Sequence, residues 1–177
     1  MERALFLDRD GIINVDKGYI HKKEDVEFVD GIFDLCSLAK KRGYHIFVVT
    51  NQAGIDRGLY DHSHVAILHG WMKEEFRKRA IEITEMYYCP HHPEFSGPCP
   101  CRKPEPGMLL KAMEEYGIDA SASVMIGDKA GDVQAGKRAG VGFCVLVSSR
   151  YVDDIPAEAD AVADSVRAAF DMLSDRL

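Results

Sequence analysis

The sequence predicts an α/β protein built on a doubly wound, Rossmann-like parallel sheet. Short apolar runs alternate along the chain with segments whose apolar residues recur at helical spacing, a pattern typical of a parallel sheet covered by helices on both faces. Two of the apolar runs end in aspartates, and 177 residues is close to the usual length of one domain. We therefore expect a single domain over residues 1–177 with the strand order 3-2-1-4-5.

The first half of the chain contains three predicted strands and two predicted helices. Residues 4–7 are an apolar run too short for a helix, which predicts a buried strand. Residues 31–42 carry apolar side chains at helical spacing and are followed by a glycine, a common residue just past a helix. Apolar runs at residues 45–49 and 83–88 predict the second and third strands, with a helix between them from about Ser63.

The second half continues the alternation. A helix is expected over residues 106–116, with proline in the first turn, where its missing N–H removes no helical hydrogen bond. The other predicted elements are strands at residues 124–126 and 143–147, helices at residues 130–139 and 164–177, and a short sixth strand at residues 159–162.

Two stretches, residues 11–30 and residues 89–105, lack a clear element. Loops of this length in a compact domain are usually functional. Neither is long enough to fold as a separate unit, so we expect no large cap domain and a fairly open crevice.

The composition argues against several classes of partner. The charged side chains give a net charge of −7, whereas a nucleic-acid-binding protein would show a basic stripe. No apolar run approaches the ~18 residues of a membrane helix, and the first residues lack the pattern of a signal peptide. We therefore expect a cytoplasmic protein, a monomer, with neither nucleic acid nor a membrane as partner.

Carboxylates follow two of the predicted strands. Asp8 and Asp10 come directly after the first strand and project to the same side if the extended geometry continues. Asp128 follows the fourth strand, and Asp132 lies one helical turn further on. Parallel strands end at one edge of the sheet, so Asp8, Asp10 and Asp128 are expected around one small volume that suits Mg²⁺. The alternative is ordinary turn chemistry and helix capping.

Hydrogen-bond donors follow the second predicted strand. Thr50, Asn51 and Gln52 supply a hydroxyl and two amides suited to phosphate oxygens, and Lys103 can bring positive charge to the same crevice. Taken alone, these residues are explained equally well by a turn and a surface lysine. The chain has no GxxxxGK[ST] loop and no GxGxxG motif, which disfavours an NTPase and a dinucleotide-dependent oxidoreductase.

Together these residues resemble the four motifs of the haloacid dehalogenase (HAD) superfamily phosphatases, in the same order. The motifs correspond to residues 8–11, Thr50, Lys103 and residues 127–132. Within the superfamily the chain is similar to the heptose bisphosphate 7-phosphatases, which share most of their motifs with phosphatases acting on histidinol phosphate. The segments that carry this narrower resemblance are residues 14–19, 50–55, 89–93 and 101–104.

The resemblance implies a role for each of these residues. Asp8 would be the nucleophile that forms an aspartyl phosphate, and Asp10 would protonate the leaving oxygen and then activate water. Mg²⁺ would be held by Asp8, the Asp10 carbonyl and Asp128, while Thr50 and Lys103 would stabilise the transferring phosphoryl group. The expected substrate-binding residues are Asp16, Lys17, Gly18, Tyr19, Asn51, Gln52, Arg102 and Lys129.

Cysteines cluster in the second long loop. Cys89, Cys99 and Cys101 with a neighbouring histidine form a Cys₃His set, the composition of a closed structural zinc site. Both His91 and His92 are candidates from the residues alone, and the resemblance favours His91. Four prolines between Cys89 and Cys101 restrict the loop without giving it a core, which bound zinc would supply. The alternative is a set of free thiols brought close by coincidence.

The resemblance implies Mg²⁺-dependent hydrolysis of the 7-phosphate of D-glycero-D-manno-heptose 1,7-bisphosphate, a step toward nucleotide-activated heptose for lipopolysaccharide. The substrate is then a small-molecule sugar phosphate, with histidinol phosphate as the alternative. A zinc-stabilised binding module with an inactive site is disfavoured, because every carboxylate of the four motifs is present. A phosphatase acting on polynucleotide ends conflicts with the net charge of −7.

Overall fold

A computed structural model describes residues 1–150, 155–156 and 158–177. The described strands form a six-stranded sheet in the order β3-β2-β1-β4-β5-β6, in which all neighbours pair in parallel. This confirms the doubly wound sheet and the strand order expected from the sequence. The strands are β1 (Arg3–Leu7), β2 (Tyr44–Asn51), β3 (Glu85–Cys89), β4 (Val124–Gly127), β5 (Phe143–Val147) and β6 (Ala161–Ala163).

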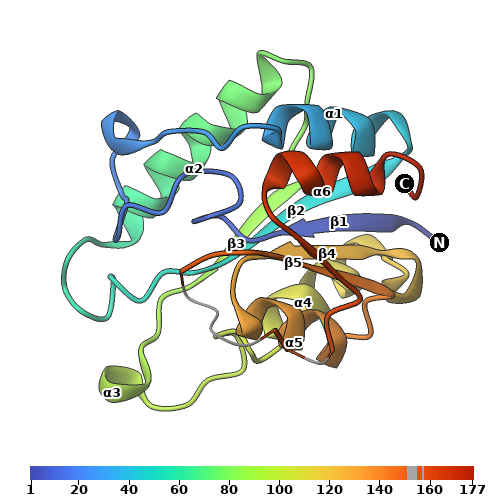
Figure 1. Cartoon of the computed structure of the whole chain (residues 1–177). Helices are drawn as coiled ribbons and strands as arrows, with labels where there is room; N and C mark the ends of the chain where they lie inside the picture. The colour runs from blue at the N-terminus through green and yellow to red at the C-terminus, as the bar shows by residue number, and fades with distance from the viewer. Residues whose placement is uncertain (151–154, 157) are drawn as a thin grey trace.

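Helices cover both faces of the sheet (Figure 1). One face carries α1 (Ile32–Lys41), α2 (His62–Arg77) and α6 (Val166–Leu173), and the other carries α4 (Gly107–Tyr116) and α5 (Ala130–Arg138). A further short helix, α3 (Pro93–Ser96), lies in the second long loop. Two single 3₁₀ turns complete the described helices, at Lys23–Asp25 and Ala120–Ala122.

The alternation of side chains along β1 divides the core into two halves. Leu5 and Leu7 belong to the cluster that includes α1, α2 and α6, whereas Phe6 belongs to the cluster that includes α4 and α5. All three side chains are fully buried. Successive strand residues point to opposite faces, so a strand buried on both faces has no polar alternation. This explains why the continuous apolar run at residues 4–7 predicts a strand correctly.

The structure differs from the expected element bounds mainly near the C-terminus. The last helix ends at Leu173, four residues before the predicted end, and the turn that follows places Leu177 on the core with 5% exposure. The Leu177 carbonyl oxygen accepts a hydrogen bond from Arg42 Nη1 at 2.5 Å. The sixth strand lies at Ala161–Ala163, so it begins two residues and ends one residue later than expected, and it pairs with β5.

All strands run in the same direction, so their carboxyl ends share one edge of the sheet. In Figure 1 this is the edge near α3, opposite the two chain termini. The long loops after β1 and β3 both leave from it. Within the part of the chain that the structure describes, no helix is both long enough and apolar enough to cross a membrane.

Candidate active site

Three buried carboxylates meet at the carboxyl ends of β1 and β4. Asp8 follows β1, Asp128 follows β4, and Asp132 lies in the first turn of α5. Their exposed fractions are 4%, 2% and 2%, and one oxygen atom of each lies within 4.8 Å of the others. The meeting of Asp8 and Asp128 agrees with the prediction from strand topology. The third carboxylate of this cluster is that of Asp132, whereas the side chain of Asp10 has other partners.

Two glycines let the backbone pass close to this cluster. Gly11 has φ +93°, and a Cβ atom there would lie 2.1 Å from Asp128 Oδ2. At Gly127 a Cβ atom would lie 2.1 Å from the Asp132 Cβ atom. Only glycine combines this freedom of φ with the missing side chain. The close approach of Asp128 and Asp132 therefore explains why positions 11 and 127 are glycine.

Lys103 brings a buried positive charge to the carboxylates. Its Nζ atom donates to Asp8 Oδ1 at 2.9 Å and to the Val49 carbonyl oxygen at 2.7 Å, and lies 2.7 Å from Asp132 Oδ1. Burial alone would lower the pKa of the Lys103 ammonium group, but Asp132 and Asp8 outweigh burial and raise it. The ammonium group therefore stays charged at neutral pH.

Asn51 fixes the backbone from which Lys103 extends. Its Nδ2 atom donates to the Lys103 carbonyl oxygen at 3.2 Å, and its Oδ1 atom accepts from the Lys103 N–H at 3.0 Å. Asn51 lines the cavity as expected of a substrate-binding residue, but its amide is already engaged with the protein.

The carboxylates of Asp8 and Asp128 fit a divalent cation. Burial, followed by the charge of Asp132, raises the pKa of Asp8 to about 6 although Lys103 opposes the shift. Burial, followed by the charges of Asp8 and Asp132, raises the pKa of Asp128 to about 8. Asp128 Oδ1 is buried and has no hydrogen-bond partner. Two anionic groups that destabilise each other, with an oxygen left unpartnered, form a site that Mg²⁺ suits.

Asp132 is already used by the protein. Its Oδ2 atom accepts hydrogen bonds from the backbone N–H groups of Asp128 and Lys129, both at 3.1 Å. Its Oδ1 atom contacts Lys103. Asp132 therefore holds the turn between β4 and α5 and orients the lysine, and its position does not require a metal.

Asp10 lies in a separate network of hydrogen bonds. Its carboxylate accepts from Arg9 Nε at 3.1 Å, from Arg9 Nη2 at 3.0 Å, from Asn14 Nδ2 at 3.0 Å and from Gln52 Nε2 at 3.0 Å. Burial would raise the pKa of Asp10, but the charge of Arg9 and these hydrogen bonds outweigh burial and lower it. In this arrangement Asp10 is a carboxylate.

Sequence reasoning assigned no role to Arg9 or His69. Arg9 is fully buried, and its Nη1 atom lies 3.2 Å from His69 Nε2. Burial and the charge of Arg9 lower the pKa of His69 to about 3, so the neutral ring accepts the hydrogen bond. The signal for Arg9 was its place between two aspartates at a strand end, whereas His69 is 60 positions away along the chain.

A cavity of about 460 Å³ opens over these residues. Thr50, which is 1% exposed, lies beneath it and contacts the lining residue Gln52. Lys17 falls outside this cavity and pairs with Glu27 at 3.5 Å. The expected substrate-binding residues that line it are Asp16, Gly18, Tyr19, Asn51, Gln52, Arg102 and Lys129, and the structure adds Arg57, Tyr60 and His92.

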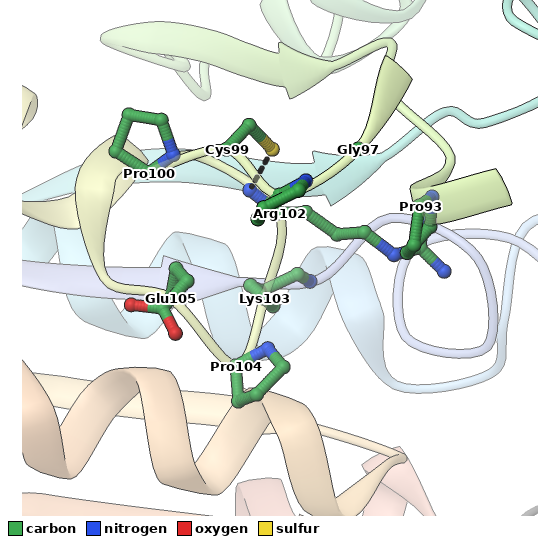
Figure 2. Close-up of a pocket in the computed structure, with 9 residues that line it drawn as sticks. Pro93, Gly97, Cys99, Pro100, Arg102, Lys103, Pro104 and Glu105 are labelled. Carbon is green, nitrogen blue, oxygen red and sulfur yellow. Dashed lines mark hydrogen bonds between the residues drawn. The ribbon is translucent and has the colours of Figure 1, made fainter. Parts of the chain in front are cut away.

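The loop after β3 forms one wall of this cavity and of a second one, also about 460 Å³ (Figure 2). Figure 2 shows Arg102 extending toward Pro93, while Lys103 extends toward the end of β1. Arg102 is held at two points, because Cys99 Sγ lies 3.4 Å from its backbone N–H and the His91 carbonyl oxygen accepts from its Nη1 atom at 3.2 Å. The cysteine loop thus positions both cations of the Arg102-Lys103 pair.

Three of the four expected zinc ligands lie together. The sulfur atoms of Cys89, Cys99 and Cys101 are within 4.8 Å of one another. Cys99 Sγ is 3.6 Å from Cys89 Sγ and 3.7 Å from Cys101 Sγ. Cys89 and Cys101 are close enough to be joined as a disulfide. Such a cluster can bind a metal ion or, two sulfurs at a time, form a disulfide.

Among the residues that the structure describes, no histidine ring joins this group of three sulfurs. His91 Nδ1 is nevertheless buried without a hydrogen-bond partner, and the nearest ion-pair contact, Asp56 Oδ2, is 3.9 Å away. Both ring nitrogens of His92 are engaged, with Arg57 Nη2 at 3.0 Å and the Glu94 N–H at 3.2 Å. Of the two histidines, His91 is therefore the one able to accept a metal.

Comparisons with known proteins agree with this geometry. The HAD-hydrolase-like family model matches residues 100–169. The D-glycero-beta-D-manno-heptose-1,7-bisphosphate 7-phosphatase of Yersinia pestis is 45% identical over 168 residues, which cover 92% of this chain and 88% of the relative. The D-glycero-alpha-D-manno-heptose-1,7-bisphosphate 7-phosphatase of Campylobacter jejuni is 50% identical over 146 residues, which cover 82% and 83% of the two chains.

A solved structure shows the same likeness. The D,D-heptose 1,7-bisphosphate phosphatase of B. bronchiseptica, crystallised with magnesium and phosphate, superposes with a TM-score of 0.86 at 26% identity, and the match covers 100% of both chains. Fold, strand order and sequence identity therefore lead to one conclusion: the chain is a phosphoric monoester hydrolase that belongs to the heptose-1,7-bisphosphate 7-phosphatase family of HAD-like hydrolases.

Proposed function

We propose that the chain hydrolyses the primary 7-phosphate of a D-glycero-D-manno-heptose 1,7-bisphosphate, with Mg²⁺ and through an aspartyl phosphate on Asp8. The observation that carries this proposal is the 2.9 Å contact between Lys103 Nζ and Asp8 Oδ1 in a buried cluster below the cavity. It places a carboxylate, largely ionised at neutral pH, beside a permanent positive charge. This pairing suits attack on an anionic phosphate.

In the first step an Asp8 oxygen bonds to phosphorus, and the bond between phosphorus and the sugar oxygen breaks. Lys103 touches the attacking carboxylate, so its charge lies next to the transferred phosphoryl group. Thr50 Oγ1 accepts from Gln52 at 2.9 Å and donates to the Asn51 carbonyl oxygen over a long 3.5 Å, a weak contact that a phosphoryl oxygen can replace. Mg²⁺ held by Asp8, Asp128 and the Asp10 carbonyl would offset the repulsion between carboxylate and phosphate.

Asp10 is the proposed general acid and base. Its network favours the carboxylate, and a phosphate dianion entering beside it raises the pKa of Asp10, because like charges disfavour ionisation. Once protonated, Asp10 gives its proton to the leaving sugar oxygen. In the second step it takes a proton from water as the water oxygen bonds to phosphorus. The bond between phosphorus and Asp8 then breaks and releases phosphate.

The cations of the cavity wall support the choice of a bisphosphate as substrate. Arg57, Arg102 and Lys129 line the same cavity as Lys103. An extended sugar whose primary phosphate reaches Asp8 would place its 1-phosphate among these side chains, and arginine can bind a phosphate through two parallel hydrogen bonds. The two relatives are named for different anomers, so both anomers belong in the assay.

We further propose a structural zinc ion held by Cys89, Cys99, Cys101 and His91. Three gathered sulfurs and a buried, unpartnered imidazole nitrogen support this ligand set. A disulfide between Cys89 and Cys101 would leave the buried His91 nitrogen without a partner. The zinc would stabilise the loop that carries Arg102 and Lys103.

The direct test is phosphorus NMR of the reaction with the purified α and β anomers of heptose 1,7-bisphosphate, and with histidinol phosphate for comparison. We expect the 7-phosphate resonance to disappear while the 1-phosphate resonance remains, and hydrolysis to be faster than for histidinol phosphate. Asp8→Asn, which cannot form the acyl phosphate, is the control for a contaminating phosphatase. Initial loss of the 1-phosphate, or faster hydrolysis of histidinol phosphate, would contradict the proposal.

A further inference from the structure

We infer that Gln52 and Tyr60 form a clamp that positions the Asp10 carboxylate for proton transfer, so that Gln52 is a positioning residue rather than a contact to the substrate. The inference rests on the proposed acid and base role of Asp10. It does not depend on which phosphate ester is the natural substrate.

The hydrogen-bonding groups of the Gln52 amide are engaged with the protein. A glutamine side chain has two N–H donors and one carbonyl oxygen. Nε2 donates to Asp10 Oδ2 at 3.0 Å and to Thr50 Oγ1 at 2.9 Å, and Oε1 accepts from the Tyr60 hydroxyl at 2.5 Å. Gln52 is 2% exposed. Although it lines the cavity, both of its donors are occupied, so it has none for a phosphate.

Tyr60 fixes the orientation of this amide. Its ring is 6% exposed and stacks on His21 with 5.0 Å between ring centroids. The ring also lies against Gly54, where a Cβ atom would come within 2.2 Å of Tyr60 Cε1. The Tyr60 hydroxyl can donate to Oε1 but not to the amide nitrogen, which already carries two protons. A flipped amide would turn its oxygen toward the Asp10 carboxylate, which can only accept, so Asp10 sets the amide orientation and the hydrogen bond from Tyr60 to Oε1 holds it.

Gln52 controls one side of the Asp10 carboxylate. Oδ1 is held by Asn14 and by the two shorter contacts of Arg9. Oδ2 accepts from Gln52 at 3.0 Å and from Arg9 only at the longer distance of 3.2 Å. Loss of the Gln52 contact would free the carboxylate to rotate about its last bond. A general acid must lie within hydrogen-bond reach of the leaving oxygen, so this rotation should impair proton transfer.

The test compares two small esters that differ in how much they need an acid. Phenyl phosphate has the more basic leaving group and depends on protonation, whereas 4-nitrophenyl phosphate has a good leaving group and depends on it little. The measured quantity is kcat/KM, which reports the steps up to the first irreversible one, here formation of the aspartyl phosphate. Tyr60→Phe removes only the hydroxyl, and Gln52→Met removes the amide at nearly constant length.

We expect Tyr60→Phe to lower kcat/KM for phenyl phosphate about 3- to 10-fold, the usual effect of one hydrogen bond, and to lower kcat/KM for 4-nitrophenyl phosphate less than about 2-fold. Gln52→Met should lower kcat/KM for both esters, because it also removes the hydrogen bond to Thr50. The loss for phenyl phosphate should be at least about threefold larger than the loss for 4-nitrophenyl phosphate. The matched control is Tyr87→Phe, which removes a hydroxyl bonded to Glu115 outside the cavity and should change neither value.

Equal losses on the two esters in both variants would overturn the inference, since they would mean that Gln52 acts through Thr50 or through the fold of the loop. No loss in either variant would overturn it as well. Thermal unfolding of each variant identifies one that fails to fold, and the other variant then decides. If the wild type hydrolyses both aryl esters but not a heptose bisphosphate, the proposed substrate fails while the test of the clamp still stands.

Discussion

Replacing Gly11 with alanine should change both the Mg²⁺ affinity of the site and the stability of the fold, and the two effects can be measured separately. A Cβ atom at this position would lie 2.1 Å from Asp128 Oδ2. Cβ atoms in proteins essentially never come closer than 3.0 Å to another heavy atom of this kind. The Asp128 carboxylate must therefore move by more than about 1 Å to restore an ordinary contact. Because Asp128 is a proposed ligand of Mg²⁺, we expect the variant to bind Mg²⁺ poorly.

The expected magnitudes follow from two separate effects. Alanine at φ +93° should destabilise the protein by about 1–2 kcal/mol, which lowers Tm by about 2–8 °C for a chain of this size. Loss of a residue that only supports a metal ligand typically weakens metal binding 10- to 100-fold. Moving the ligand itself should weaken binding at least as much, and a shift of about 1 Å can also lower the rate about 10²-fold.

The assay is the Mg²⁺ concentration that gives half-maximal activity, measured beside Tm. The matched control is Gly43→Ala, because Gly43 has φ +80° and a Cβ atom there would meet no other atom within 4 Å. Gly43→Ala should lose the stability that the positive φ alone costs, and Gly11→Ala at least as much, but only Gly11→Ala should need at least about 10-fold more Mg²⁺. An unchanged Mg²⁺ requirement in folded Gly11→Ala would refute the placement of Asp128 in the metal site.

Three further predictions concern pH, the distal phosphate and the cysteine loop. Protons compete with Mg²⁺ for the carboxylates of Asp8 and Asp128, whose pKa values are raised to about 6 and about 8. The half-activating Mg²⁺ concentration should therefore fall as the pH rises from 6 to 8 and stay constant at higher pH. A half-activating concentration that rises with pH would contradict this. Arg102→Ala should raise KM for the bisphosphate about 10- to 150-fold and leave phenyl phosphate nearly unchanged, whereas equal losses would place Arg102 at the reacting phosphate. Purified protein should hold about one equivalent of zinc after EDTA has removed Mg²⁺, and Cys99→Ala should lose it; zinc-free protein with Cys89 and Cys101 oxidised would refute the zinc site.

The parts of the site that could be predicted are those that topology alone determines. A parallel sheet sends the ends of β1 and β4 to one edge at the reversal of strand order, so the meeting of Asp8 and Asp128 follows from where each strand ends. The same argument places Thr50 at the end of β2. No side-chain detail is needed for these conclusions.

The partners of the polar loop residues could not be predicted, because they depend on contacts across long stretches of chain. Asn51 holds the backbone of Lys103, 52 positions away, and Gln52 turns its amide toward Asp10, 42 positions away. A side-chain amide after a strand is equally suited to a phosphate oxygen and to a protein group. Only the folded loops decide which partner it meets.

The end of the last helix and the helix in the cysteine loop could not be predicted either. Helical spacing continues past Leu173, where the helix ends, and Leu177 is still buried on the core. In the cysteine loop, the sulfur cluster could be expected from the spacing of the cysteines. The short helix α3 could not, since His92 caps it with a side-chain hydrogen bond to the Glu94 N–H that the sequence alone does not indicate.

The central claim is that Asp8, paired with Lys103 beneath the cavity, accepts the phosphoryl group. The most direct measurement is acid quenching of the enzyme during turnover of ³²P-labelled substrate, followed by peptide mapping. We expect acid-stable label on the peptide that contains Asp8, released by hydroxylamine as for an acyl phosphate, and no label in Asp8→Asn. Turnover by wild-type enzyme without any such label, or label on a peptide that lacks Asp8, would contradict the account.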